Sequence, residues 1–447
     1  MSKKNLREVA LQLLQQVGEH GGYSHILINQ AIQKNDLSNQ DKGLLTEIVY
    51  GSLQRKLTLQ FYLKPFVGNK KLDKWVQWLL YMSVYQMVYL DRVPDHAIIN
   101  EAVQISKKKG HRGISGFVNG VLRNIQRKGV ADFSTIEDPV ERLSVETSHP
   151  AWMVERWVDQ YGYEKTSEMC HSNIIQKQVS VRVQPLKLTR NQAMDILQSE
   201  GYEVSEAGLS PQGIHVDTGN VLNSSLFPNQ ITIQDETSML VSEMMDLEEN
   251  MKVLDACSAP GGKATHIAEK MKDSGEVLAY DLHAKKVKLV KDKAETLNLS
   301  NIQTNPYDSR KLQEVHSEET FDRILLDAPC SGLGVLRSKP DIKYHKNVSD
   351  IEQLSTIQNE LLHSVLPLMK KDGKLVYSTC TVDHAENEWQ IDKVLKEFPE
   401  LEVDQSFFDQ LPKECQSLDG LSEFGLQIFP QDFQADGFFI TRLQWKY

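Results

Sequence analysis

Two of the five cysteines, Cys330 and Cys380, lie in polar loops where a thiol could do chemistry. Cys330 follows the apolar run in "LLDAPCSGLG", and Cys380 follows the apolar run in "LVYSTCTVDHAENE". A cysteine thiolate can add to C6 of a pyrimidine, which lets C5 accept a methyl group before the C5 proton and the thiol leave. That chemistry needs an ionised thiol, an acid near the base and a proton-transfer partner. A single cysteine is more often a small buried hydrophobe, but two in polar loops beside Asp327 favour chemistry.

The stretch "DACSAPGGKATH" has the features of a ligand-binding loop between a strand and a helix. Gly261 and Gly262 let the backbone approach a ligand closely, and the following helix N-terminus offers free N–H groups to negative charge. A phosphate-binding P-loop is excluded, because the positions of its first glycine and its Ser/Thr hold Cys257 and Ala264. Asp281 ends the next predicted strand, where an acid can accept hydrogen bonds from ribose hydroxyls. These features predict a nucleoside-containing cofactor without a pyrophosphate.

Acidic residues recur at the ends of the strands predicted in this region: Asp255, Asp281, Asp308 and Asp327. In a parallel sheet the carboxyl ends of the strands share one edge, where ligands bind. Like charges gathered at one edge repel one another, so stability alone does not explain the cluster. The thiols of Cys330 and Cys380 are expected at the same edge.

The elements that must position these side chains alternate regularly from about residue 250. Apolar strands such as "KVLDAC" and "GEVLAYDL" are followed by amphipathic helices such as "HAKKVKLVKDKAETL". This alternation predicts a doubly wound, mainly parallel α/β sheet. We assign residues 236–447 to this α/β domain.

Two other regions precede the α/β domain. Residues 1–140 show helical periodicity, as in "NLREVALQLLQQV", and predict an all-α bundle that begins with the first residues of the chain. After a linker, "QVSVRVQPLKLTRNQAMDILQSEGYEVSEAGLSPQGIHVD" predicts a strand, a helix capped by Thr189 and short strands. We assign residues 141–235 to this linker and a small α+β module. The chain of 447 residues is thus predicted to be multidomain.

Charge is unevenly distributed along the chain. Of the 50 Lys and Arg and the 61 Asp and Glu residues, residues 1–140 hold 19 basic and 12 acidic ones. This region therefore carries +7 and the remainder −18, although the whole chain carries only −11. A basic region joined to an acidic body fits a polyanion-binding domain attached to an enzyme, although chance variation on solvated faces would give the same numbers.

Cysteine spacing and hydropathy exclude several classes of protein. The longest apolar run, "WVQWLLYMSVYQMVYL", is interrupted by Gln and Ser and is shorter than a membrane span of about 20 residues. The N-terminus lacks the pattern of a signal peptide, so we expect a cytoplasmic protein without a membrane partner. No disulfide framework or metal site is expected, because no CxxC pair and no zinc-finger spacing occurs among the five cysteines: Cys170, Cys257, Cys330, Cys380 and Cys415.

Three stretches closely resemble one family of enzymes. "DACSAPGGKATHIAE", "DAPCSGLGVLRSKPDIKY" and "LVYSTCTVDHAENE" resemble the RNA cytosine-5 methyltransferases of the Sun group. The helical N-terminal region resembles the NusB-like domain of the RsmB (Sun/Fmu) branch, so the resemblance covers essentially the whole chain. It implies a Rossmann-like methyltransferase domain that uses S-adenosyl-L-methionine. It also implies 16S ribosomal RNA as the substrate, at the cytosine of nucleotide 967.

The resemblance assigns roles to residues by motif position. Cys380 matches the nucleophile, Cys330 matches the thiol that assists release, and Asp327 matches the acid at the substrate end of the cofactor pocket. Asp281 matches the ribose-binding acid, and Asp308, in a loose version of its motif, matches the adenine-side acid. The cofactor loop corresponds to seven residues, in which serine replaces the alanine expected most often at the second position: Cys257, Ser258, Ala259, Pro260, Gly261, Gly262 and Lys263.

Three alternatives remain open. In a DNA cytosine-5 methyltransferase the Pro-Cys thiol is the nucleophile, which would leave "STC" and the NusB-like domain without a role. The same chemistry on a tRNA or on another rRNA cytosine is a closer competitor. A non-catalytic NusB-like RNA-binding factor is the third, and the intact Cys330, Cys380, Asp327 and glycine loop speak against it.

Candidate RNA contacts lie in the basic helical region. "SKKKGHRG" and the later Arg123, Arg127 and Lys128 are candidates for phosphate contacts, although a solvated helix end explains any one of these charges as well. The α+β module is expected to help present RNA, and which side of its sheet Arg182 faces is left open. A base within folded rRNA must be unstacked to reach the thiol. We expect a monomer that acts on rRNA, free or in an early small-subunit particle.

Overall fold

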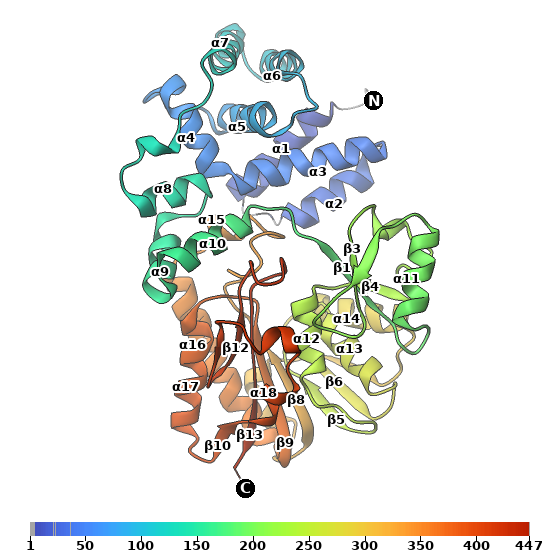
Figure 1. Ribbon diagram of the computed structural model, residues 1–447. Helices are drawn as coiled ribbons and strands as arrows, with labels where there is room; N and C mark the ends of the chain where they lie inside the picture. The colour runs from blue at the N-terminus through green and yellow to red at the C-terminus, as the bar shows by residue number, and fades with distance from the viewer. Residues whose placement is uncertain (1–4, 21, 23, 36, 447) are drawn as a thin grey trace. The chain divides into compact units, whose positions relative to one another are not determined.

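The computed structural model describes residues 5–20, 22, 24–35 and 37–446. It divides the chain into two compact units, drawn in Figure 1. Unit 1 comprises Met1–Ile175 and Leu336–Lys346, and unit 2 comprises Gln176–Val335 and Asn347–Tyr447. The first four residues, which the predicted helical region includes, lie outside the described residues. In the described ranges, no helix is both long enough and apolar enough to cross a membrane.

Unit 1 is helical throughout its described part, which confirms the predicted all-α region. Apolar side chains at helical spacing meet in one core, which includes Leu14 of the first helix, Leu45 of the third and Leu79 of the fifth. The helices are α1 (Leu6–His20), α2 (Ser24–Lys34), α3 (Asn39–Gln54), α4 (Lys56–Val67), α5 (Lys74–Tyr89), α6 (Asp95–Lys109), α7 (Arg112–Lys128), η1 (Phe133–Thr135), α8 (Pro139–Glu146), α9 (Ala151–Tyr161), α10 (Tyr163–Asn173) and α15 (Ile342–His345).

The segment Leu336–Lys346 belongs to unit 1, although in sequence it follows the loop that holds Cys330. Its Lys343 is fully buried and donates a hydrogen bond to the carbonyl oxygen of Gln54, at 2.8 Å. Its Asp341 accepts a hydrogen bond from the Ser24 hydroxyl. The predicted domain boundaries at residues 140 and 235 do not take this segment into account. These boundaries stay a prediction.

Unit 2 contains the α+β module that the sequence predicts. Its four strands form an antiparallel sheet in the order β2–β3–β1–β4. Thr189 caps the helix with a capping box completed by Gln192, as its position predicts. The elements are β1 (Val179–Val183), α11 (Arg190–Ser199), β2 (Val204–Glu206), β3 (Gly213–Val216), η2 (Val221–Asn223) and β4 (Ile231–Ile233).

The larger sheet of unit 2 has the order β11–β12–β13–β9–β8–β5–β6–β7, and β10 pairs with β13. Neighbours from β9 to β7 are parallel, as predicted. Its strands are β5 (Lys252–Asp255), β6 (Glu276–Asp281), β7 (Ile302–Pro306), β8 (Phe321–Asp327), β9 (Met369–Thr379), β10 (Leu401–Val403), β11 (Leu421–Ser422), β12 (Gly425–Ile428) and β13 (Phe438–Trp445).

Helices cover both faces of this sheet, so its central strands are apolar on both sides. Along β8, Ile324 and Leu326 enter one core cluster and Leu325 enters the other. The associated helices are α12 (Glu236–Glu243), α13 (Gly262–Lys270), α14 (Ala284–Leu297), η3 (Ser309–Glu314), α16 (Val348–Val365), η4 (Leu366–Leu368), η5 (His384–Glu386), α17 (Glu388–Glu397), α18 (Ser406–Gln410) and η6 (Lys413–Cys415).

The C-terminal strands are antiparallel, which the strand–helix alternation does not predict. β11 and β12 are joined by a tight turn between Ser422 and Gly425, and a connection this short permits only antiparallel pairing. β13 then pairs with the edge of β9 in the opposite direction. The sheet is therefore mixed, with a parallel central part that carries the predicted site residues.

Candidate active site

Three of the predicted acids end adjacent parallel strands. Asp255 is the last residue of β5, Asp281 of β6 and Asp327 of β8. Because β5 pairs with both β6 and β8 in parallel, the three carboxyl groups lie along one edge of the sheet. Asp308 lies just beyond β7 and caps η3. The structure thus brings the predicted acids to a shared edge.

Asp255 is the most deeply buried of these acids, with an exposed fraction of 0%. Burial, and then the nearby charge of Asp327, raises its pKa to about 8. The Lys263 charge and then the Cys257 backbone amide offset this shift only in part, and neither Asp255 carboxyl oxygen has a hydrogen bond of normal geometry within the described part of the chain. Asp255 is therefore a carboxyl group that can hold a proton near neutral pH.

The glycine loop turns directly from β5 into α13. The Ser258 amide and hydroxyl both donate to the carbonyl oxygen of Tyr280 on β6, at 2.8 and 3.0 Å. Gly261 has a φ of +96°, and a Cβ there would lie 3.0 Å from the Cα of Val290, so this turn requires glycine. The loop therefore keeps its backbone at the strand edge, with the N-terminus of α13 beside it.

The remaining positions of the 257–263 loop differ from one another in burial and in contacts. Cys257 packs against the core of unit 2, and burial raises the pKa of its thiol well above the usual value, which favours the protonated thiol. Ala259 is half-buried and Pro260 is exposed. Lys263 points toward Asp327 and belongs with the thiols described below.

Asp281 ends β6 and places its carboxyl group at the edge of the sheet. Its Oδ1 accepts from the backbone amide of His283 at 3.1 Å, and the Lys286 ammonium is 4.0 Å away. Its side chain is 11% exposed, so it reaches the surface of the edge. This arrangement leaves acceptor capacity for hydroxyl groups.

Asp308 is held by Arg310 in a two-point ion pair. The guanidinium Nε and Nη2 lie 3.0 and 2.7 Å from its two carboxylate oxygens, and these hydrogen bonds lower the pKa of Asp308. A ligand would have to share or displace Arg310. The role assigned to Asp308 by motif position stays a prediction, and Arg310 is a neighbour that sequence reasoning missed.

Asp327 connects the glycine loop with the strand that leads to Cys380. Its Oδ2 accepts from the Lys263 ammonium at 2.7 Å, and its Oδ1 accepts from the Ser378 hydroxyl at 2.9 Å. Burial alone would lower the pKa of Lys263, but the Asp327 carboxylate and the Cys380 sulfur outweigh burial and raise it. Lys263 is therefore a permanent cation beside Asp327 and Cys380.

The two thiols of the opening motifs meet. The Sγ atoms of Cys330 and Cys380 are 3.4 Å apart, although the residues are 50 positions apart in sequence. The contact with Cys380, followed by burial, raises the pKa of Cys330 well above its usual value. Cys380 therefore contacts a second thiol and lies near the Lys263 ammonium, whose pKa the Cys380 sulfur helps to raise.

Two residues that sequence reasoning missed tie the thiol loops together. Glu386 accepts from the backbone amide of Ser331 at 2.8 Å and from its hydroxyl at 2.5 Å, which fixes the loop after Cys330. Asn387 accepts from the Thr379 hydroxyl at 2.5 Å and donates to the carbonyl oxygen of Thr381 at 3.2 Å, which fixes the loop around Cys380. The sequence signal is the polar run "AENE", in which Glu386 and Asn387 are buried.

Comparison with known proteins gives matches along most of the chain. The family model described as 16S rRNA methyltransferase RsmB/F matches residues 242–444. The NusB family model matches residues 4–127. A model for the ferredoxin-like domain of RsmF/B-like methyltransferases matches residues 149–222.

Individual relatives match over their whole length. The probable ribosomal RNA small subunit methyltransferase B of Bacillus subtilis is 46% identical over 100% of both chains. A protein of the same name from Synechocystis is 31% identical over 98% of this chain and 99% of its own. Among solved structures, the crystal structure of PH0851 has a TM-score of 0.82 at 26% identity and covers 99% of each chain.

Proposed function

The chain belongs to the RsmB/F family of 16S rRNA methyltransferases, and we propose that it methylates C5 of a cytosine in the small-subunit rRNA. The methyl donor is S-adenosyl-L-methionine. The proposal extends to the cytosine of nucleotide 967 and to a covalent bond between Cys380 and C6 of the base. The observation that carries it is the pair of thiols 3.4 Å apart, beside the Lys263 ammonium.

The residues at the strand edge fit the methyl donor. The 257–263 loop brings backbone amides close to a ligand, because Gly261 adopts a conformation that other residues rarely reach. Asp281 offers a carboxylate for ribose hydroxyls, and the buried Asp255 lies next to the loop with carboxyl oxygens that have no hydrogen bond of normal geometry among the described residues. Bound here, S-adenosyl-L-methionine supplies an electrophilic methyl group.

Cys380 begins the reaction on the base. Lys263 stabilises its thiolate, which adds to C6 and forms an S–C6 bond while the C5=C6 electron pair moves toward C5 and the ring. The Lys263–Asp327 pair lies beside this thiol and can hydrogen-bond the ring as negative charge develops on it. C5 thereby becomes nucleophilic, the property that methylation at carbon requires.

Cys330 completes the reaction. Its Sγ lies 3.4 Å from that of Cys380, so Cys330 lies close to the base that is bonded to Cys380. After its thiol has given its proton to water, the Cys330 thiolate accepts the C5 proton and becomes a thiol again. The C–H electron pair restores the C5=C6 bond, the S–C6 bond breaks, and Cys380 is released as a thiolate.

The helical region supplies affinity for RNA in this proposal. Residues 1–140 carry +7, in contrast to −18 for the rest of the chain. Positive charge near the phosphate backbone gives binding that is independent of base sequence. We propose a monomer that acts in the cytoplasm on rRNA, free or within an early small-subunit particle, without a metal ion.

Release of tritium from C5 tests the reaction. The full chain is incubated with S-adenosyl-L-methionine and 16S rRNA carrying [5-³H]cytosine, and methyl incorporation and tritium release are measured together. The proposal predicts equal amounts of both. Methyl incorporation without tritium release would place the methyl group elsewhere, and the absence of both would favour a non-catalytic RNA-binding factor.

The choice of substrate needs a separate comparison. Naked 16S rRNA, assembled small subunits and tRNA are offered to the same enzyme, and the methylated nucleotide is located by bisulfite sequencing. We expect modification of 16S rRNA at one cytosine. Faster methylation of tRNA would mean that the enzyme performs the same reaction on tRNA, the alternative substrate.

A further inference from the structure

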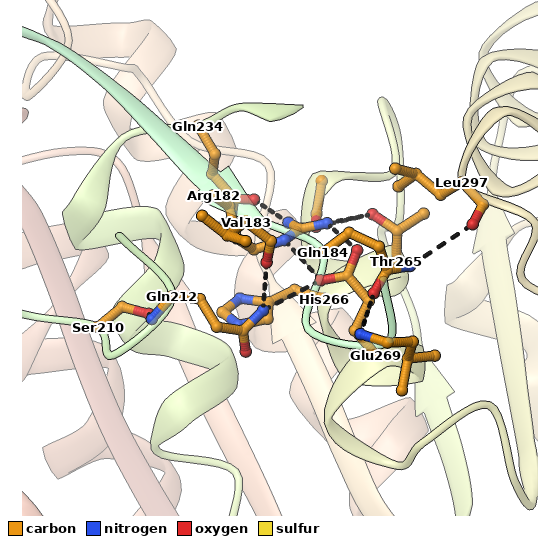
Figure 2. A network of polar contacts seen from close by, with 12 residues as sticks. Arg182, Val183, Gln184, Ser210, Gln212, Gln234, Thr265, His266, Glu269 and Leu297 are labelled. Atoms are coloured by element: carbon orange, nitrogen blue, oxygen red, sulfur yellow. Dashed lines mark hydrogen bonds and ion pairs between the residues drawn. The ribbon is translucent and has the colours of Figure 1, made fainter. Parts of the chain in front are cut away.

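Arg182 lies on β1 of the α+β module and is buried against α13 of the methyltransferase domain (Figure 2). Along β1, Val181 and Val183 enter the core of the module, while Arg182 faces the other side of its sheet. The sequence did not determine which side of the sheet Arg182 faces. The Arg182 side chain and its ion-pair partner, Glu269, are both 0% exposed.

The guanidinium group of Arg182 uses all of its N–H groups. Nε and Nη2 donate to the two carboxylate oxygens of Glu269, at 2.8 and 2.9 Å. Nη1 donates to the carbonyl oxygen of Gly262 at 2.7 Å, and Nη2 donates to the Thr265 hydroxyl at 3.0 Å. The second Nη1 hydrogen bonds to the side-chain oxygen of Gln234. Five donors in a rigid plane therefore meet five acceptors.

Two of these acceptors belong to the first turn of α13, which continues the glycine loop. Besides accepting from Arg182, the Thr265 hydroxyl lies 2.8 Å from the carbonyl oxygen of Gly261, to which it donates. The guanidinium group thus contacts Gly262 directly and Gly261 through one hydroxyl. Both glycines lie where the backbone turns at the strand edge.

The energetics of this ion pair favour a positional role over a stabilising one. Removing two charges from water costs free energy that their attraction often only offsets, so an apolar pair of similar volume can be as stable. The pair here is fully hydrogen-bonded, since Gln212 also donates to Glu269, at 3.2 Å. What a planar, five-donor group adds is a fixed location for the atoms that it contacts.

We propose that Arg182 is a positioning residue for the cofactor loop, and that the α+β module thereby completes the binding site for S-adenosyl-L-methionine. The inference rests on the proposed assignment of residues 257–263 as the cofactor loop. The module has a second task besides presenting RNA. Without Arg182, the first turn of α13 loses the donors that hold Gly262 and Thr265.

The full chain is tested with two variants at this site and one matched control. Arg182→Lys keeps the charge but cannot donate to Glu269, Gly262 and Thr265 together. The double variant R182M/E269M removes both buried charges and leaves none unpaired. The control is Arg442→Lys, because Arg442 is also 0% exposed and pairs with Asp404 at 2.7 Å, but none of its hydrogen bonds reaches the glycine loop.

Affinity for S-adenosyl-L-methionine is measured by calorimetry in the absence of RNA, together with the melting temperature. Arg182→Lys should raise Kd at least about tenfold, equal to about 1.4 kcal/mol. KM for the methyl donor should rise by the same factor, with kcat nearly unchanged. R182M/E269M should melt close to wild type and still bind weakly. R442K should melt lower than wild type and bind with wild-type affinity.

A purely structural role gives a different pattern. If R182M/E269M restores both melting temperature and affinity, or if Arg182→Lys melts lower but binds normally, the inference is wrong. Asp281→Ala separates this failure from failure of the proposed site. If Asp281→Ala weakens binding and the Arg182 variants do not, only the positioning role is lost. If no variant weakens binding, the assignment of the cofactor loop is also lost.

Discussion

At the scale of single residues, the site controls which groups carry charge in a buried environment. Lys263 lies beside Asp327 and Cys380 and stabilises negative charge on either. Asp255, which is more deeply buried near Asp327, takes up a proton instead of adding another anion. One cation therefore lies beside both a carboxylate and the thiol that we propose as nucleophile.

Replacing Asp255 should change how stability depends on pH. Its pKa is about 8 in the folded protein, so the folded state keeps a proton that the unfolded state loses above about pH 4. The free energy of unfolding therefore falls as pH rises from about 4 to about 8, by at most about 1.4 kcal/mol per pH unit from this group. Asp255→Asn has no carboxyl group to titrate at this position. Its stability relative to wild type should therefore increase between pH 5.5 and pH 8, a range of about two pH units.

Urea unfolding of wild type and Asp255→Asn at both pH values measures this difference. Comparing the two proteins cancels the titration of all other groups. An identical difference at both pH values would mean that Asp255 is ionised throughout this range.

Asp281→Ala tests the proposed ribose contact. Loss of a buried hydrogen-bonding partner costs about 1–2 kcal/mol, so affinity for S-adenosyl-L-methionine should fall about 5- to 30-fold. Asp292→Ala, an exposed acid on α14, is the control and should bind normally. Calorimetry measures both. Unchanged affinity of Asp281→Ala would remove this residue from the site.

At the scale of elements, two loops must be held together for the thiols to meet. β8 leads into the loop of Cys330 and β9 leads into the loop of Cys380, so their parallel pairing brings the loops to one edge. Glu386 on η5 and Asn387 just after it then bind one loop each. The Glu386 side chain accepts from the Ser331 amide and hydroxyl, and the Asn387 side chain accepts from the Thr379 hydroxyl, so these buried donors have partners.

Glu386→Gln should separate the positioning of Cys330 from cofactor binding. The amide retains the size of the side chain but turns one acceptor that faces Ser331 into a donor. A buried unpaired group costs about 1–3 kcal/mol, so kcat should fall about 5- to 150-fold. Affinity for S-adenosyl-L-methionine, measured by calorimetry, should stay normal. Normal kcat in Glu386→Gln would show that the loop of Cys330 is held by other contacts.

Sequence patterns predicted the elements better than the contacts between them. Apolar runs that end in Asp255 or Asp327 predict strands, because the residue types within one short segment are enough to identify a strand. The alternation along β1 shows that Ser180 and Arg182 share a face, but α13, which covers that face, lies some eighty residues later. Likewise nothing local in "NPYDSR" distinguishes an Asp308 that faces a ligand from one paired with Arg310.

At the scale of the whole molecule, the chain leaves unit 2 after the loop of Cys330 and returns before α16. The intervening segment belongs to unit 1, where its buried Lys343 contacts Gln54. The sequence did not reveal this, because "RSKPDIKYHKN" is polar and has no strong helical or strand periodicity. Deleting residues 1–140 would remove the partners of this segment, so RNA affinity is better tested by point variants.

Neutralising basic residues of α7 should weaken RNA binding and its dependence on salt. Each phosphate contact contributes about 0.7–0.9 to the slope of log K against log salt, so removing three lowers the slope by about 2. Filter binding between about 50 and 200 mM salt measures it. The variant replaces three α7 residues with alanine: Arg123, Arg127 and Lys128.

The control for the α7 variant removes three charges from unit 2 that are each paired with a carboxylate: Lys272, Lys371 and Lys396. The control variant changes the net charge of the chain by the same amount as the α7 variant. A control slope that falls as much as the α7 slope would mean that total charge, and not the helical unit, determines RNA affinity.

Covalent trapping of RNA tests the central claim, that the two thiols act at different steps. Wild type, Cys330→Ala and Cys380→Ala are incubated with labelled 16S rRNA and S-adenosyl-L-methionine and then separated by denaturing electrophoresis. Cys330→Ala should accumulate a stable protein–RNA adduct, because it attacks and methylates but cannot release the base. Cys380→Ala should form no adduct and no methylated product. An adduct in Cys380→Ala and none in Cys330→Ala would reverse the roles, and methylation by both variants without any adduct would contradict the mechanism.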